Sequence, residues 1–351
     1  MNIYYYWVIG ELAVIFLFFS FIIYKLWRTA KAKEKAGKPN LPETLNGKIS
    51  HYTKYILRIL GVGLGAFVGV ALFITIERTL LSVYMETAPT PSEVTIPPDL
   101  GFEVEEITFS SEDGITLAGW LVPSQNDATI ILLHGYGGNR MGMIWHAEKL
   151  VNAGYGVLMY DERASGESTG EYRSYGWEDT RDVRAAIRFI QSRKAGEKIG
   201  AAGCSTGADI VVYSAALYPE LGAIWGDGNS TVRAQDLPLP KNPIMALLIA
   251  GNYLLDWMYT VKLGIEAPPP MIEVLPDIAP RPVVFVGGGR ERPVVGSEAE
   301  LFTLRFAELA GSNAQAWIIH EATHCDGPFV RTEEYTARMV KFFDTAFGVT
   351  R

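Results

Sequence analysis

The sequence predicts an α/β protein, with a mostly parallel sheet flanked by helices, preceded by two transmembrane helices. Three observations carry this prediction. Two long apolar runs stand near the N-terminus, and from Leu100 onward short apolar runs alternate with amphipathic stretches. Such alternation is typical of a parallel sheet covered on both faces. A small-residue turn, Gly203-Cys204-Ser205-Thr206-Gly207, separates an apolar run from a helical pattern.

The two N-terminal runs are each long enough to cross a bilayer. They cover about residues 4–27 and 55–76, and a spanning helix needs about 20 apolar residues. Charged residues are few, with Glu11 and Lys25 in the first run and Arg58 in the second. No lysine or arginine precedes the first run, which does not fit a cleavable signal peptide. We therefore expect residues 1–87 to form a membrane anchor.

The loop between the runs is basic. The chain from Lys25 to Arg58 holds nine basic residues, whereas Arg78 alone lies close on the outer flanks; the nine are Lys25, Arg28, Lys31, Lys33, Lys35, Lys38, Lys48, Lys54 and Arg58. Positively charged loops stay in the cytoplasm, so both termini are expected to face outward. The C-terminal domain is then expected on the extracytoplasmic side of a multi-pass membrane protein.

A stripe of small residues lies on one face of the second run, at Gly61, Gly65 and Gly69. Such a stripe allows another helix to approach closely. Its partner is either the first run or a second copy of the chain, which would form a homodimer.

The composition excludes some partners and leaves one question about the cysteines. A net charge of −8 argues against nucleic-acid binding, which requires a basic face. The two cysteines, Cys204 and Cys325, cannot build a disulfide framework or a cysteine-rich zinc site. They either form one disulfide or are two small buried thiols.

The remaining chain is divided by its apolar pattern. Residues 88–100 are rich in proline and predict a semi-rigid linker to a domain over residues 101–351. Residues 103–123 predict a hairpin that turns at Glu112-Asp113-Gly114. Further strands are predicted over residues 129–133, 156–160, 199–204, 223–225, 282–286 and 316–319, and helices over residues 177–193 and 297–310.

One insertion, about residues 228–279, interrupts this alternation. It contains an apolar stretch over residues 243–263. The insertion is either a pair of packed connecting helices or a cap that offers apolar surface to a substrate.

Ser205 lies where a predicted strand gives way to a predicted helix. A strained serine at such a turn needs small neighbours, and Gly203 and Gly207 supply them. The turn also places the Thr206 N–H at a helix N-terminus, where it can stabilise an oxyanion.

From about Phe102 to Arg351 the chain resembles the α/β-hydrolase superfamily. Besides the Ser205 turn, His134-Gly135-Tyr136-Gly137-Gly138-Asn139 is similar to its H-G-x-G loop. Asp161-Glu162-Arg163-Ala164-Ser165-Gly166-Glu167-Ser168 is similar to its D-x-R-G-x-G-x-S turn, with Ala164 in place of a glycine. The resemblance implies an α/β-hydrolase fold, in which the insertion is expected to form a helical cap, and Tyr136 N–H as the second oxyanion donor. The second motif is expected to be structural only.

A serine nucleophile needs a base, and the base needs an acid that orients it. The family order is serine, acid, histidine. His324 follows the last predicted strand and is the expected base, whereas His320 still continues that strand. The resemblance places Glu291 at the position of the family's acid. Asp227, which follows the preceding strand, is the alternative.

The sequence thus predicts a membrane-anchored serine hydrolase that cleaves an acyl ester or lipid-like small molecule through an acyl-enzyme. Neither a metal nor an organic cofactor is expected. Three alternatives stay open: an acyltransferase that uses the same acyl-enzyme, a peptidase, and a non-catalytic binding protein on a hydrolase scaffold.

Overall fold

The computed structural model describes residues 18, 20–22, 24–25, 28–29, 31–32, 44–290, 297 and 299–350. The chain divides into two compact units, Met1–Leu80 and Leu81–Arg351. The boundary falls inside helix α2 (Leu45–Thr87), so the last turns of this helix belong to the second unit.

Helix α2 contains one segment with the length and composition of a membrane span. This segment is Ile56–Thr87, with a mean hydropathy of 2.5 in its most apolar window, of which only 6% is buried. It includes most of the second predicted run. The first predicted run, residues 4–27, lies largely outside the described residues.

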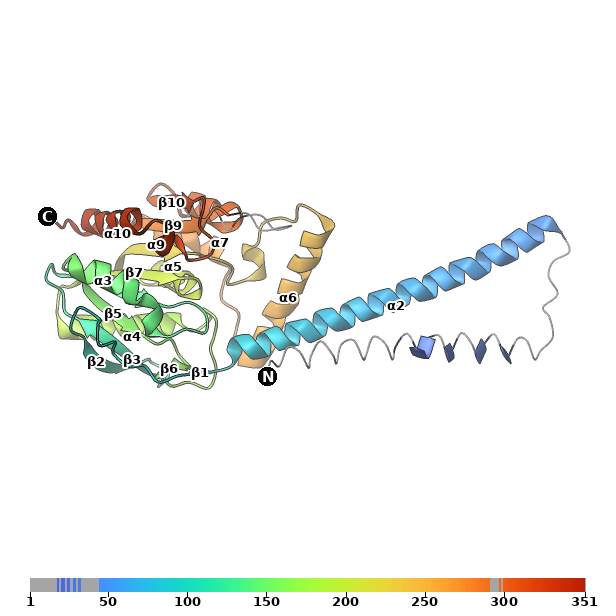
Figure 1. Ribbon diagram of the computed structural model, residues 1–351, viewed down its shortest axis with the longest axis horizontal. Helices are drawn as coiled ribbons and strands as arrows, with labels where there is room; N and C mark the ends of the chain where they lie inside the picture. Colours follow the sequence, from blue (N-terminus) through green and yellow to red (C-terminus); the bar gives the residue numbers. More distant parts are fainter. Residues whose placement is uncertain are drawn as a thin grey trace. The chain divides into compact units, whose positions relative to one another are not determined.

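The second unit is built on an eight-stranded sheet in the order β10-β9-β8-β7-β4-β5-β3-β2 (Figure 1). Its strands are β2 (Glu105–Ser110), β3 (Thr116–Val122), β4 (Ala128–Leu133), β5 (Gly156–Tyr160), β7 (Lys198–Cys204), β8 (Leu221–Asp227), β9 (Val283–Gly288) and β10 (Ala314–Ile319). All neighbours from β10 to β5 are parallel, and the β2–β3 hairpin is antiparallel. The predicted mostly parallel sheet is confirmed.

Helices connect these strands and cover both faces of the sheet. They are α3 (Ile144–Asn152), α4 (Thr180–Arg193), α5 (Thr206–Leu217), α6 (Pro243–Leu263), α7 (Met271–Val274), α8 (Leu304–Ala310), α9 (Gly327–Val330) and α10 (Thr332–Phe347). The central strand β4 shows why two covered faces are needed. Ile131 and Leu133 pack into the core beside α4, α5 and α8, whereas Ile130 and Leu132 pack into the core beside α3 and α10. Alternate side chains point to opposite faces of a strand, so a fully apolar strand requires helices on both.

Part of the proline-rich stretch is held by the second unit. Strand β1 (Thr90–Pro91) pairs in parallel with β6 (Ser165–Gly166). Thr90 N and Ser92 N donate to the carbonyls of Ala164 and Gly166. The stretch after α2 is therefore fastened to the turn that follows β5.

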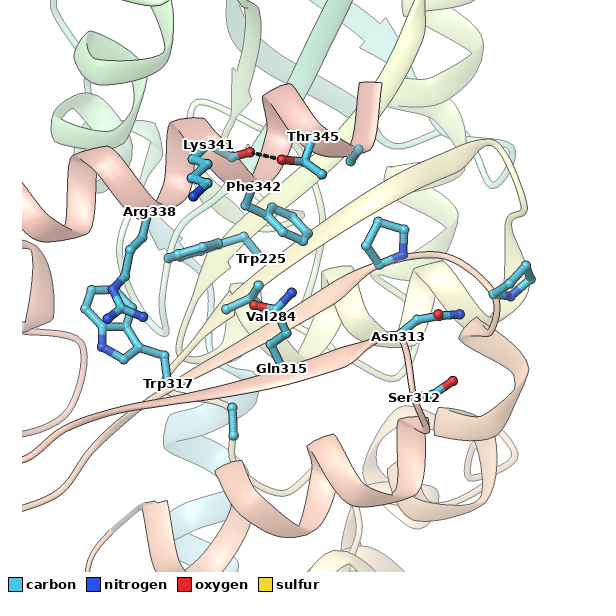
Figure 2. Close-up of a pocket in the computed structure, with 14 residues that line it drawn as sticks. Trp225, Val284, Ser312, Asn313, Gln315, Trp317, Arg338, Lys341, Phe342 and Thr345 are labelled. Carbon is cyan, nitrogen blue, oxygen red and sulfur yellow. Dashed lines mark hydrogen bonds between the residues drawn. The ribbon is translucent and has the colours of Figure 1, made fainter. Parts of the chain in front are cut away.

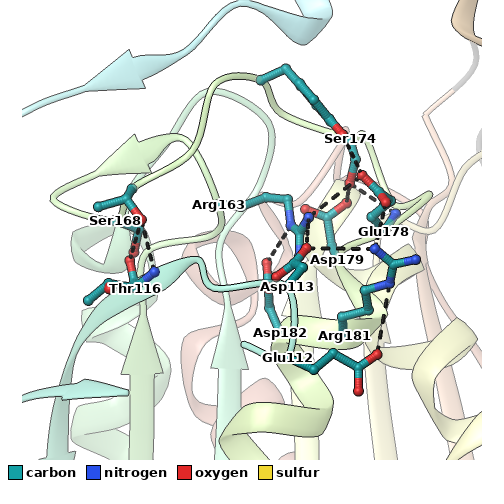
Figure 3. Close-up of polar contacts among 12 residues, drawn as sticks. Glu112, Asp113, Thr116, Arg163, Ser168, Ser174, Glu178, Asp179, Arg181 and Asp182 are labelled. Carbon is teal, nitrogen blue, oxygen red and sulfur yellow. Dashed lines mark hydrogen bonds and ion pairs between the residues drawn. The ribbon is translucent and has the colours of Figure 1, made fainter. Parts of the chain in front are cut away.

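The Asp161–Ser168 turn is organised by one buried arginine (Figure 3). Arg163 is 3% exposed, and its guanidinium donates to both carboxylate oxygens of Asp182 on α4 and to Asp113 in the hairpin turn. Ala164 has a φ of 56°, in the left-handed region that favours the glycine usual at this position. The turn therefore joins three segments of the fold.

Candidate active site

Ser205 lies at a strained turn between β7 and α5. Its φ of 57° and ψ of −124° are rare for a residue with a side chain. A Cβ on Gly203 would lie within 3.0 Å of the Gly207 backbone, and one on Gly207 within 3.0 Å of the Leu133 and His134 carbonyl oxygens. Side chains at these positions would clash with backbone. The predicted need for two glycines at this turn follows directly from this packing.

His324 reaches Ser205 from the other side. Its Nε2 lies 2.8 Å from the Ser205 Oγ, within hydrogen-bond distance. Ser205 follows β7 and His324 lies in the loop after β10, and the carboxyl ends of parallel strands meet at one edge of the sheet. The structure thus brings together the two residues that the sequence names as nucleophile and base.

The loop that holds Tyr136 lies against Ser205. A Cβ on Gly135 would lie 3.2 Å from the Ser205 Cβ. His134 fixes the loop from inside, because its Nε2 accepts from Glu162 N at 3.0 Å and its Nδ1 lies 2.9 Å from Gly135 O. Nε2 is an acceptor here, so Nδ1 carries the proton and donates to that carbonyl. Burial lowers the pKa of His134, which favours this neutral form.

Two buried carboxyl groups adjoin the site. Burial, followed by the nearby Asp179, raises the pKa of Glu162 well above its ordinary range. Burial raises the pKa of Asp209, on the first turn of α5, to about 7. Its carboxylate accepts from Asn229 and Ser230, which limits that shift. Both groups are buried, and the hydrogen bonds of the Asp209 carboxylate hold the segment at Asn229 and Ser230 against α5.

Of the two candidate acids, Asp227 lies within the described residues and Glu291 does not. Asp227 ends β8, is 3% exposed, and its Oδ2 accepts from Tyr335 OH at 2.8 Å. Its carbonyl oxygen accepts from Ser205 N at 2.8 Å. A Cβ on the next residue, Gly228, would lie 3.1 Å from the His324 Nδ1. The chain at Asp227 therefore passes beside both Ser205 and His324.

Glu291 lies outside the described residues, but the loop that leads to it is described up to Arg290. Gly289 N donates to Ile319 O at 2.9 Å and Arg290 N donates to Ala322 O at 3.2 Å. The loop after β9 therefore runs beside the segment that precedes His324.

Sequence reasoning missed Tyr335 on α10. Its hydroxyl accepts from Trp225 Nε1 at 2.7 Å and donates to Asp227 Oδ2, which completes a buried hydrogen-bonded chain. No motif marks Tyr335, because it is one of several aromatic residues on the buried face of a helix.

Cys204 and Cys325 are not joined in a disulfide. The Cys325 Sγ lies 3.4 Å from the Asp227 carbonyl oxygen, and the Cys204 Sγ lies 3.8 Å from where a Gly135 Cβ would be. Across the described part of the chain, no group of three or more His, Cys, Asp or Glu side chains is placed to hold a metal ion.

The insertion packs on the catalytic unit through helix α6. Met258, Tyr259 and Leu263 are buried in the core, whereas Trp257 and Val261 are 60% and 65% exposed. An aromatic ladder links this helix to the Tyr136 loop. The ring of Tyr259 stacks on Tyr175 at 6.2 Å, and Tyr175 contacts Tyr136 edge to face at 5.8 Å.

A pocket of about 820 Å³ opens elsewhere, between α10 and the sheet edge formed by β9 and β10. Figure 2 shows Trp225, Trp317 and Phe342 around it, with Arg338 and Lys341 from α10. Its lining residues on β9 and β10, Val284 and Gln315–Trp317, end before the last two residues of those strands. Because Ser205 and His324 follow the carboxyl ends, this pocket is separate from the candidate active site.

Comparisons with known proteins agree with this architecture. The family described as Hydrolase_4, Serine aminopeptidase, S33, matches residues 124–234. The uncharacterized protein YfhR of Salmonella typhimurium is 28% identical over 263 residues, which cover 70% of this chain and 83% of that protein. YfhR of Escherichia coli K12 is 26% identical over 224 residues, which cover 53% and 76%.

Solved structures show the same fold. The esterase Pf2001 of Pyrococcus furiosus matches with a TM-score of 0.59 and 23% identity, over 74% of this chain and 99% of that one. The α/β hydrolase GrgF from Penicillium matches with a TM-score of 0.55 and 18% identity, over 70% and 100%. With its sheet order, its serine turn and these likenesses, this chain has the α/β-hydrolase fold.

Proposed function

We propose that this protein is a serine hydrolase that cleaves carboxylic esters through an acyl-enzyme on Ser205. The observation that carries the proposal is the 2.8 Å contact between the Ser205 Oγ and the His324 Nε2 at a strained strand-to-helix turn. A serine beside a base on such a turn is the arrangement that nucleophilic acyl transfer requires. The S33 family match and the esterase likeness support a hydrolase.

In the first half-reaction His324 Nε2 accepts the hydroxyl proton as the Ser205 Oγ attacks the ester carbonyl carbon. The carbonyl oxygen becomes an oxyanion, which the backbone N–H groups of Tyr136 and Thr206 stabilise. The imidazolium then returns its proton to the leaving alkoxide, and the carbon–oxygen bond to the alcohol breaks. Water attacks the acyl-enzyme by the same route, with His324 again accepting and returning a proton. One such oxyanion donor commonly contributes about 10²–10³ in rate.

The acid that orients His324 is Glu291 in this proposal, with Asp227 as the alternative. The loop after β9 runs beside the segment that precedes His324, which favours Glu291. Asp227 already accepts a hydrogen bond from Tyr335 within a buried chain that also includes Trp225. That environment suits a residue that stabilises the fold behind the site.

The substrate is an acyl ester with an apolar acyl group, such as a lipid-like small molecule. Tyr136, which is 45% exposed beside Ser205, contacts Tyr175, which in turn stacks on Tyr259 of helix α6, and this aromatic environment supports an apolar acyl group. The likeness to an esterase favours an ester over an amide. The match to a family described as a serine aminopeptidase makes an N-terminal peptide bond the second candidate for the scissile bond.

The enzyme is anchored in a membrane by two helices, over about residues 4–27 and 55–76, with the catalytic domain on the extracytoplasmic side. The candidate span in α2 supports the second helix. The basic loop between the runs supports the orientation. The Gly61, Gly65 and Gly69 face pairs with the first helix or with a second copy of the chain.

A fluorophosphonate probe, which phosphonylates activated serines, tests the proposal on membranes that contain the full chain. Wild type is expected to be labelled and Ser205→Ala to lose the label. Ser214→Ala is the matched control, because Ser214 is a buried serine on the same helix as the Ser205 turn. Hydrolysis of p-nitrophenyl esters, compared with aminoacyl p-nitroanilides, then separates esterase from aminopeptidase. An unlabelled wild type would overturn the proposal and favour a binding protein.

A further inference from the structure

The last turn of α2 leaves carbonyl groups that need donors, as every helix C-terminus does. One residue of the second unit, Arg173, supplies hydrogen-bond donors to most of these carbonyl groups. Arg173 donates from its backbone N to Thr87 O at 3.0 Å, from Nη2 to Met85 O at 2.8 Å and from Nε to Ala88 O at 2.7 Å. A cation at a helix C-terminus also complements the helix dipole.

Arg173 also holds the side chain of Tyr136. Its guanidinium lies 4.3 Å from the centre of the Tyr136 ring, and Nη2 lies 3.3 Å from the Tyr136 hydroxyl. That hydroxyl donates to Met85 O at 3.1 Å, so Tyr136 and Arg173 share one carbonyl of α2. Arg173 is only 7% exposed, and a buried cation is stable only with such partners.

The backbone of the same loop is confined from two sides. Gly135 lies against Ser205, with 3.2 Å between its Cβ position and the Ser205 Cβ. Gly137 has a φ of +66°, and its Cβ position lies 3.4 Å from Arg173 Nη1. Within the described residues this Nη1 is buried and has no hydrogen-bond partner. Tyr136 thus stands between Gly135, which packs against the nucleophile, and Gly137, which packs against Arg173.

We propose that Arg173 is a positioning residue for the oxyanion site, an inference that rests on the proposed function. By holding the Tyr136 side chain at the end of α2 and packing beside Gly137, it fixes the direction of the Tyr136 N–H. An oxyanion donor acts through preorganisation, so a freely moving loop stabilises the transition state less. The carbonyl groups of the last turn of α2 then help to hold the oxyanion site in place.

The test uses the full chain in detergent micelles and measures kcat and KM for a p-nitrophenyl ester. Arg173→Met is expected to lower kcat about tenfold, a part of the 10²–10³ that a lost donor costs, with KM changed less than about twofold. Arg173→Lys keeps the charge and is expected to recover part of kcat. Tyr136→Phe keeps the ring and the backbone N–H and is expected to lower kcat less than Arg173→Met does.

Arg281→Met is the matched control, because Arg281 also donates to backbone carbonyls, those of Tyr218 and Ile278, at the amino end of β9. The changes in Tm of Arg173→Met, Tyr136→Phe and the double variant are expected to be non-additive, which tests the contact without activity. A fall in kcat that Arg281→Met reproduces would overturn the inference. So would an Arg173→Met chain whose kcat equals that of wild type. If the fluorophosphonate fails to label the wild-type protein, the proposed function itself is contradicted, and not only the role of Arg173.

Discussion

The Nε2 of His324 lies 2.8 Å from the Oγ of Ser205, although 119 residues separate them in the chain. Each residue follows a strand of the same sheet, β10 and β7, and the sheet order places β8 and β9 between those strands. The register of three consecutive parallel pairs therefore determines this contact. Substitutions in the sheet core are expected to affect reactivity through it.

Replacing His324 by Gln removes the base and keeps a side chain that can form hydrogen bonds. Since the serine then has no group to accept its proton, kcat is expected to fall by at least about 10⁴. Hydrolysis of a p-nitrophenyl ester measures this fall in kcat. Urea unfolding checks that the variant is as stably folded as wild type. His320→Gln, at an exposed position near the end of β10, is the control. A His324→Gln chain within tenfold of wild type would contradict the assigned base.

Glu291→Gln and Asp227→Asn distinguish the two candidate acids. If Glu291 orients His324, Glu291→Gln is expected to lower kcat by about 10³–10⁴ with little change in stability. Asp227→Asn is expected to lower stability by about 1–3 kcal/mol, because Tyr335 OH loses its charged acceptor. Comparing kcat with the unfolding free energy of each variant makes the assignment. The opposite pattern would assign the acid to Asp227.

Acid is expected to destabilise the fold through His146. Burial lowers the pKa of this residue from its ordinary value of 6.5 to about 4. The unfolded chain therefore binds more protons between these values, and stability present above pH 6.5 is lost as the pH falls towards 4. The loss from this group is roughly 3 kcal/mol.

His146→Phe keeps an aromatic ring against Trp145 and Tyr335 and removes the titration. The decrease in unfolding free energy between pH 7 and pH 4.5, measured in urea, is therefore expected to be smaller in this variant than in wild type. Equal decreases in the two chains would show that His146 does not become charged on unfolding.

Arg163→Met is expected to destabilise the second unit by about 3–5 kcal/mol, because it leaves Asp182 buried without its cation. Chemical unfolding gives the value, and Arg188→Met is the control. Arg188 is exposed and 3.9 Å from Glu112, so its removal should change stability by less than about 1 kcal/mol. If the Arg163→Met variant still folds and its Ser205 is still labelled by the fluorophosphonate, the role of Arg163 is structural. Unchanged stability would contradict it.

Gly207→Ala and Gly251→Ala are expected to have opposite effects. A Cβ at Gly207 meets the Leu133 and His134 backbone, so a loss of about 3 kcal/mol or more is expected, together with loss of Ser205 labelling. A Cβ at Gly251 on α6 meets nothing within 4 Å, and alanine there is expected to gain up to about 1 kcal/mol. Thermal unfolding compares the two. A stable, labelled Gly207→Ala chain would mean that the turn can relax.

The sheet was predictable because each central strand is a short run of apolar residues between turns, as in residues 156–160, which coincide with β5. The Ser205 turn was predictable because its two glycines mark a tight turn between a strand and a helix. His324 was predictable because it follows the last strand, where the family order places the histidine. Arg173 was not, since it lies in an irregular segment with no periodicity, and its partners are backbone carbonyls far along the chain. The apolar run also did not predict that its helix continues into the second unit. Hydropathy does not distinguish residues that face lipid from residues that pack against a protein domain.

The bonds from Arg173 to Met85 and Ala88 also bear on what happens when the second unit is separated from α2. Proteolytic cleavage within the proline-rich stretch would remove residues 81–88 and leave the buried Arg173 guanidinium without its acceptors. The C-terminal fragment is then expected to unfold more readily than the full chain. Relatives that lack an equivalent of α2 would need another acceptor for that charge, or no arginine there at all.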